Sequence, residues 1–278
     1  MRALAAMVRL VTALVERAAV RLADVQTCLH GLLPALLPPE ELMRLTRRYY
    51  DSSYRNISAH DLEHGHLWSL EPWEERVMAR YVRPRGQILV LGSGVGRESL
   101  ALAQSGFTVV GLDANFECLR VARQRAATIG AAAHFLQGDF SALPSRLGQF
   151  DAVLLCGVMY SAIPGRARRL FYLEAFRTAL RPGGTIVVNF LVSLAHSIPH
   201  QPRLDHAAMW LHRRLYVNPE YESGDSCTSG HFTHTFATPD ELRTELQHTG
   251  LEILELNWQE GFAVLSRETS HLRDIRAN

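Results

Sequence analysis

The chain contains no lysine, so all 29 of its Lys and Arg positions are arginine. This absence excludes any mechanism that needs a lysine base, and the bias is typical of a GC-rich, bacterial genome. The 29 basic side chains are almost balanced by 28 acidic ones. No net field therefore draws the chain to nucleic acid or to an anionic membrane, and we expect neither as a partner.

Cysteines are few and long apolar runs are missing. The four cysteines, Cys28, Cys118, Cys156 and Cys227, lie far apart without paired spacing, which argues against a zinc cluster or a disulfide framework. No twenty uninterrupted apolar residues occur, so no membrane-spanning helix is expected. We predict a cytoplasmic protein without a metal, long enough at 278 residues for one domain plus additions.

A glycine-rich turn follows the apolar run 88–91, with the sequence Gly92-Ser93-Gly94-Val95-Gly96. The run predicts a buried strand and residues 97–104 predict a helix, so the glycines occupy the turn between them. Glycine permits unusual dihedrals and lets the backbone approach a ligand closely. The next apolar run, 107–112, ends in Asp113, where a carboxylate can accept hydrogen bonds from both hydroxyls of a ribose. A nucleotide-like cofactor is therefore predicted.

Two classes of enzyme fit this pattern, those that use a nicotinamide dinucleotide and those that use S-adenosylmethionine. The dinucleotide fingerprint has another glycine three residues after its second, and this chain has Arg97 there. A pyrophosphate-binding turn is therefore disfavoured.

Further strands are predicted downstream. Residues 135–140 contain an apolar run that ends at Gly138-Asp139-Phe140, and residues 151–156 and 185–190 form two more apolar runs. Thr238 is placed to cap a helix over 239–250. Residues 251–258 alternate apolar and charged side chains and are followed by a short apolar run at 262–265, which predicts a hairpin with an antiparallel strand.

Four segments in this order, 91–98, 110–115, 137–140 and 180–184, resemble the class I S-adenosylmethionine-dependent methyltransferases. The resemblance covers residues 85–266. It implies an α/β fold with a doubly wound, seven-stranded, mostly parallel sheet and an antiparallel C-terminal hairpin strand. Residues 1–84 would be a helical extension or lid, 191–237 an inserted cap and 267–278 a tail.

The resemblance also implies a cofactor, S-adenosylmethionine, with S-adenosylhomocysteine as product. The glycines would border its methionine and ribose, Asp113 its ribose hydroxyls, Asp139 and Phe140 its adenine, and Cys156 its sulfonium. The full predicted set is Gly92, Ser93, Gly94, Gly96, Asp113, Ala114, Asn115, Gly138, Asp139, Phe140, Cys156 and Gly157. Many members of the family carry an acid two residues before the first glycine, where this chain has Val90. Because of this departure, the resemblance gives weaker support for one contact, made to the turn or to the methionine end of the cofactor.

An apolar stripe runs along the N-terminal segment at alternating spacings of four and three residues. Its members are Leu4, Val8, Val11, Val15, Ala18, Leu22, Val25, Leu29 and Leu32. Such a stripe requires a partner helix, supplied either by the protein's own body, including a helix over 40–50, or by a homodimer. Pro34, Pro38 and Pro39 are predicted to end this first helix.

Aromatic and histidine residues cluster between the first helices and the glycine turn. Tyr49, Tyr50, Tyr54, Trp68 and Trp73 predict either a lid over the cofactor, since aromatic rings attract a sulfonium, or a helical core. The cluster His60, Asp61, Glu63, His64 and His66 reads as a polar helix end rather than as a metal site.

The insertion 191–237 holds six of the 13 histidines, and such insertions commonly carry substrate specificity. A hydroxyl, amine or thiol acceptor must lose a proton, and histidine is the side chain best suited to take it near neutral pH. His231 and His234 are the leading catalytic candidates, with Tyr160 and Asp225 as weaker ones. A purely structural role for the two histidines, among Phe232 and Phe236, remains open.

The acceptor is predicted mostly from missing motifs. The chain has no Asn/Asp-Pro-Pro-aromatic turn, no Pro-Cys nucleophile and no acid directly after the strand 151–156. We therefore expect transfer to an O, N or S atom, less readily a C atom, of a small organic acceptor. The alternatives are a protein or RNA methyltransferase that docks through its N-terminal helices, and a catalytically silent cofactor-binding scaffold.

Overall fold

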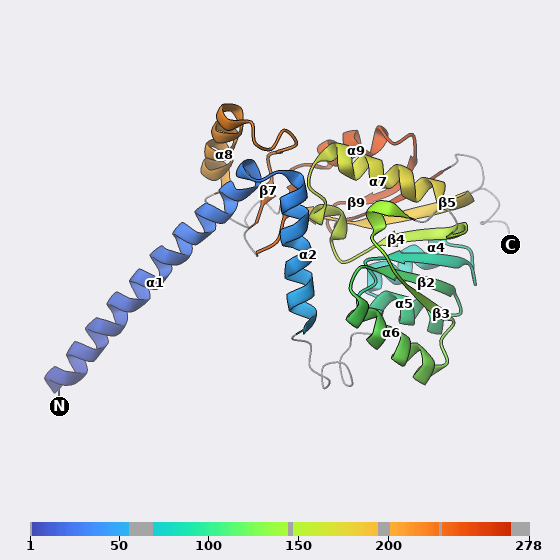
Figure 1. Cartoon of the computed structure of the whole chain (residues 1–278), viewed down its shortest axis with the longest axis horizontal. Helices are drawn as coiled ribbons and strands as arrows, with labels where there is room; N and C mark the ends of the chain where they lie inside the picture. Colours follow the sequence, from blue (N-terminus) through green and yellow to red (C-terminus); the bar gives the residue numbers. More distant parts are fainter. Residues whose placement is uncertain (1, 56–68, 144–146, 194–200, 228–229, 268–278) are drawn as a thin grey trace.

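The computed structural model describes residues 2–55, 69–143, 147–193, 201–227 and 230–267 (Figure 1). Its body is built on seven strands: β1 (Gln87–Leu91), β2 (Thr108–Asp113), β3 (Ala133–Gln137), β4 (Phe150–Leu155), β5 (Leu180–Asn189), β9 (Glu252–Asn257) and β10 (Phe262–Ser266). They form one sheet in the order β3-β2-β1-β4-β5-β10-β9. The first five are parallel neighbours and β10 is antiparallel to both β5 and β9. This topology confirms the predicted fold.

Helices cover both faces of the sheet. They are α4 (Pro72–Tyr81), α5 (Arg97–Gln104), α6 (Phe116–Ile129), α7 (Arg166–Thr178) and α9 (Pro239–Gln247), with short 3-10 turns η1 (Phe140–Ala142) and η2 (Met159–Ala162). Because side chains alternate along a strand, β1 contributes to two cores. Leu89 and Leu91 pack on the side of α7 and α9, whereas Ile88 and Val90 pack on the side of α4.

The first helix, α1 (Arg2–Leu36), runs through Pro34, so the prediction that Pro34 ends it was wrong. A proline inside a helix removes the hydrogen bond to the carbonyl four residues earlier, here that of His30. The backbone N–H of Cys227 donates to this carbonyl at 3.2 Å and replaces the lost bond. A second helix, α2 (Pro39–Arg55), begins at Pro39, a favourable first position for proline.

The insertion forms a small separate layer. It contains β6 (Leu191–Val192), α8 (Gln201–Leu215), β7 (Asp225–Ser226) and β8 (Thr233–Phe236), and its three strands pair in the order β6-β8-β7. We call residues 191–237 the cap. Only the C-terminal end of α1 lies against the cap, and the rest of the helix projects away from the body (Figure 1). Among the described residues, we find no helix long and apolar enough to span a membrane.

Candidate active site

A pocket lies over the carboxyl ends of β1, β2 and β3, where open α/β sheets bind their ligands. One wall comes from the sheet and the other from α2. The lining residues are Met43, Arg44, Thr46, Arg47, Tyr50, Asp51, Gly92, Asp113, Ala114, Asn115, Gly138, Asp139, Phe140, Met159 and Ala162. Seven of the twelve predicted cofactor residues are among them.

The glycine turn after β1 serves three separate purposes. Gly92, at φ +66°, lines the pocket, and a Cβ there would come within 3.4 Å of Met159. The Gly94 N–H donates to Asp113 Oδ2 at 2.7 Å. Gly96, at φ +93°, lets α5 begin close to α6, since its Cβ would lie 3.1 Å from that of Ala122. Of these three glycines only Gly92 lines the pocket, while Gly94 and Gly96 stabilise the turn.

Asp113 is fixed by backbone donors on both carboxylate oxygens. Besides Gly94, the Asn115 N–H donates to Oδ1 at 2.8 Å. Burial raises the pKa of Asp113, while these backbone hydrogen bonds act to lower it. The carboxylate still lines the pocket with lone pairs available, as a pair of ribose hydroxyls requires.

The end of β3 lies beside the end of β2, because the Gly138 N–H donates to the Asp113 carbonyl at 2.9 Å. Asp139 accepts from the Ser141 N–H at 2.8 Å, which starts η1 and brings Phe140 to the pocket wall. The edge of the Phe140 ring is held against Tyr172, with 5.6 Å between centroids. An apolar ring beside a fixed carboxylate fits the adenine and ribose of a nucleoside.

Helix α2 forms the opposite wall. Met43, Arg47 and Tyr50 recur every three or four residues and so face the pocket together. The other face of α2 contacts the cap, where Leu42 packs against Phe232, and Thr46 Oγ1 accepts from the Phe232 N–H at 3.1 Å. The sequence predicted a packing helix over 40–50 and a lid role for Tyr50, but it did not predict Met43 or Arg47 as lining residues, although their three-and-four spacing with Tyr50 was a usable signal.

Comparison with known proteins identifies the fold that carries this pocket. Residues 88–184 match the family model described as a methyltransferase domain. The chain contains a class I methyltransferase domain. S-adenosylmethionine is the cofactor of this domain, and the fixed carboxylate, the bare glycine turn and the apolar ring just described fit its nucleoside.

Relatives of the methyltransferase domain are known from sequence and structure. The chain is 32% identical over 166 residues to a ubiquinone biosynthesis O-methyltransferase of Dinoroseobacter shibae, covering 60% of each chain. It is 40% identical over 72 residues to YqeM of Bacillus subtilis. It spans 29% of the length of YqeM and 60% of that of the O-methyltransferase.

Two crystal structures share the fold of the methyltransferase domain. The 1,6-didemethyltoxoflavin-N1-methyltransferase of Burkholderia thailandensis, with its substrate and S-adenosylhomocysteine bound, aligns at a TM-score of 0.58 and 17% identity, over 84% of this chain and 92% of that one. A methyltransferase of Methanosarcina mazei aligns at a TM-score of 0.52 and 22% identity, over 71% of this chain and 98% of that one.

The other predicted cofactor residues of the domain do not line the pocket. Gly94 and Gly96 shape the glycine turn and lie outside the pocket lining. Ser93 is buried beneath it, with no hydrogen-bond partner for its hydroxyl among the described residues. Gly157, at φ +63°, has open space where a Cβ would be. Their contact with the cofactor, and that of Cys156, stays a prediction.

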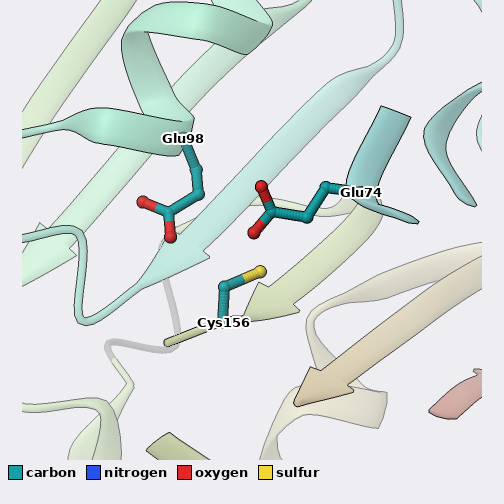
Figure 2. A group of neighbouring side chains, drawn as sticks. All are labelled: Glu74, Glu98 and Cys156. Atoms are coloured by element: carbon teal, nitrogen blue, oxygen red, sulfur yellow. The ribbon is translucent and has the colours of Figure 1, made fainter. Parts of the chain in front are cut away.

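Cys156 belongs to a buried cluster that the sequence analysis missed. Figure 2 shows the carboxylates of Glu74 and Glu98 turned toward each other, with the Cys156 thiol pointing toward Glu74. Arg97 donates to Glu74 Oε1 at 2.7 Å and to Glu98 Oε1 at 2.6 Å. One guanidinium thus faces two buried carboxylates, and burial raises the pKa of Glu98 and of Cys156. Because Arg97 already occupies both carboxylates, the cluster fits a brace between α4 and α5 better than a cation site.

Three predicted catalytic residues, His234, Tyr160 and Asp225, lie in a second buried network, between the domain and its cap. His234 is fully buried and its Nδ1 lies 2.7 Å from Asp225 Oδ1. Tyr160 is also fully buried and donates to Glu245 Oε1 at 2.5 Å. None of the three lines the pocket, so their catalytic roles remain predictions without a contact to it.

Arg169 completes this network, which we call the cap network. Its guanidinium donates to Glu245 on α9 at 2.7 Å and to Glu222 in the cap at 2.7 Å. Although burial acts to raise it, Arg169 holds the pKa of Glu245 below its usual value. The cap network joins the cap to the methyltransferase body.

His231 lies beside the α2 wall of the pocket. Its ring stacks on Tyr49, with centroids 4.2 Å apart, and lies 5.6 Å from the ring of Tyr50 in the α2 wall. Of the predicted lid aromatics, Tyr50 lines the pocket, whereas Trp73 stacks on Phe262 in the core, at 4.8 Å. Trp68 and the cluster His60, Asp61, Glu63, His64 and His66 lie outside the described residues, as does the side chain of Tyr54 near the end of α2.

Proposed function

We propose that the protein transfers a methyl group from S-adenosylmethionine to an O, N or S atom of a small organic acceptor. The observation that carries this proposal is the pocket with two walls, one with the Asp113 carboxylate and the other with the mixed face of α2. Two relatives named for small-molecule methylation, in ubiquinone biosynthesis and on didemethyltoxoflavin, support the same choice of acceptor.

The bound cofactor supplies a methyl group on a sulfonium, whose departure leaves a neutral thioether. The chain's own residues then have mainly to orient the two reactants and exclude water. Asp113 fixes the nucleoside, and its neighbour Asn115 donates to Asp51 of α2 at 2.8 Å. This bond couples the wall that holds the cofactor to the wall that faces the acceptor.

His231 is our candidate for the base that takes the acceptor's proton. It lies next to Tyr50, a residue of the α2 wall, and has a stacked, defined orientation. A positioned base contributes about 10²- to 10⁴-fold where the acceptor must be deprotonated.

Arg47 supports a further property of the acceptor, an anionic group. It lines the pocket and forms no hydrogen bond or ion pair with any residue in the described part of the chain, whereas Arg44 pairs with Glu41. A free guanidinium at a pocket wall is suited to a carboxylate or a phosphate.

Methyl-labelled S-adenosylmethionine would test the proposal directly. The purified protein is incubated with the label and a bacterial extract, which is then separated into small molecules, protein and RNA. Label that appears in the small-molecule fraction supports the proposal. Label in protein or RNA would establish the alternative acceptors. Cofactor binding without label transfer to any fraction would favour a silent scaffold.

A further inference from the structure

The apolar stripe of α1 is exposed along most of its described length. Val15, Leu22, Val25 and Leu29 are 62%, 70%, 55% and 59% exposed. Among the stripe side chains that the structure describes, only Leu32 at the end is covered by the protein's own body, where it packs with Ala35 against Ala208 and Met209 of α8. A contiguous apolar stripe of this length normally marks an interaction surface.

The period of the stripe indicates what covers it. Spacings of four and three repeat without interruption from Leu4 to Leu32, an average of 3.5 residues that matches a coiled coil. Outside the stripe the helix carries Glu16 and Asp24 together with Arg2, Arg9, Arg17 and Arg21, so its polar surface is of mixed sign. An anionic lipid surface would instead favour a uniformly basic face. The expected partner is therefore another helix.

The stripe is self-complementary when two copies run antiparallel. The eight positions from residue 4 to residue 29 then pair among themselves without remainder, and position 32 is left for its own α8. The pairs are Leu4 with Leu29, Val8 with Val25, Val11 with Leu22, and Val15 with Ala18. A surface that fits a copy of itself is typical of a two-fold symmetric interface.

The area is sufficient for a stable dimer. The five described and exposed side chains of the stripe, at positions 15, 18, 22, 25 and 29, would remove on the order of 500 Å² per helix from water at about 100 Å² each. Pairing of the three earlier positions of the sequence stripe would bring this to roughly the 800 Å² that a standard interface buries on each partner. Because α1 projects away from the body (Figure 1), an antiparallel arrangement keeps the two methyltransferase bodies at opposite ends of the pair.

We propose that the protein is a homodimer held by an antiparallel coiled coil of the two α1 helices. This pairing leaves both pockets open, and it does not depend on the identity of the acceptor.

The full-length protein would be tested by sedimentation velocity over a roughly hundredfold range of concentration. Val15→Glu places a charge on the stripe. Val20→Glu is its matched control, because Val20 is also 62% exposed but lies on the opposite side of the helix. Thermal unfolding and S-adenosylhomocysteine binding show that the body of each variant is intact.

We expect a dimeric wild-type protein, an unchanged Val20→Glu variant, and at least about 100-fold weaker association of Val15→Glu, because two unpaired carboxylates would be buried per dimer. A monomeric wild type would overturn the proposal, and binding of that monomer to phosphatidylglycerol vesicles would assign the stripe to a lipid surface. Equal behaviour of the two variants would also overturn it, since the interface would then not be the stripe.

Discussion

The two walls of the pocket are held by different kinds of contact. On the sheet side, Asp113 is fixed by Gly94 and Asn115, which are 19 and 2 residues away in the sequence. On the helical side, α2 is fixed by the cap, through bonds such as that between Thr46 and Phe232, 186 residues apart. The sheet wall is thus encoded locally, whereas the α2 wall, which we propose faces the acceptor, depends on the cap being folded against the body.

The cap in turn depends on buried charges. Arg169 bridges Glu245 of the body and Glu222 of the cap, and both its guanidinium and Glu245 are almost completely removed from water. The cofactor wall contains no comparable ion pair among its described lining residues. Substitutions in the two walls should therefore have different effects. Those in the sheet wall should change the affinity for the cofactor, and those in the α2 wall and the cap network should change turnover and stability.

The largest expected effect is on turnover. His231→Ala should lower kcat by about 10²- to 10⁴-fold, because the acceptor's proton loses its base. Affinity for S-adenosylhomocysteine, measured by calorimetry, should stay unchanged. His206→Ala, on the exposed side of α8, is the control. Full activity of His231→Ala at all pH values would remove the residue from the mechanism.

Loss of Arg169 should destabilise the protein by about 3–5 kcal/mol, because Glu245 would be left buried and unpaired. The test is chemical unfolding of Arg169→Leu. Arg177→Leu, on the same helix, removes an exposed ion pair with Glu174 and should cost less than about 1 kcal/mol. Similar losses in the two variants would contradict the account of the cap network.

Arg47→Gln should raise the KM for an anionic acceptor by about 10- to 150-fold, equivalent to about 1.5–3 kcal/mol for a hydrogen bond to a charged group. Affinity for S-adenosylhomocysteine should not change. A weaker affinity for S-adenosylhomocysteine, with that for 5′-methylthioadenosine preserved, would instead assign Arg47 to the cofactor's own carboxylate.

Asp113→Ala should weaken S-adenosylhomocysteine binding by about 1–3 kcal/mol, because the ribose hydroxyls would be buried without an acceptor. Calorimetric titration measures this loss, with Asp240→Ala as a control outside the pocket lining. Since Asp113 lies on the locally built wall, the cap network and its stability should be unaffected. Binding equal to that of the wild type would refute its assigned role.

The smallest effect concerns pH. Burial raises the pKa of Glu98 above its unfolded value, so the folded state binds a proton more tightly than the unfolded state. The resulting stability is present at low pH and is lost as pH rises through the folded pKa. Glu98→Gln should therefore raise the melting temperature relative to wild type, and more at pH 8 than at pH 5. A pH-independent difference would show that Glu98 does not titrate in this way.

The parts of the structure that the sequence predicted are those with local causes. The glycine turn and Asp113 lie close together in the sequence, with Gly94 and Asp113 19 residues apart, and Thr238 caps α9 by accepting from the Glu241 N–H. The sheet as a whole was expected only from the resemblance to a known family. The missed parts depend on distant contacts. Pro34 is tolerated because the Cys227 N–H, far away in the sequence, donates to the His30 carbonyl.

The pocket's second wall was missed for the same reason. Neither Met43 nor Arg47 belongs to a motif, and only the packing of α2 between the cap and the sheet brings them opposite Asp113. The catalytic assignment of His231 stays a prediction, because its stacking on Tyr49 defines its position but not its role.

The central claim is that the pocket binds an adenosyl cofactor through its sheet wall, and calorimetric titration of the wild-type protein with S-adenosylhomocysteine and NADH tests it most directly. We predict one molecule of S-adenosylhomocysteine bound per chain in the micromolar range, about −8 kcal/mol, and no binding of NADH. Binding of NADH, or of neither ligand, would contradict the account.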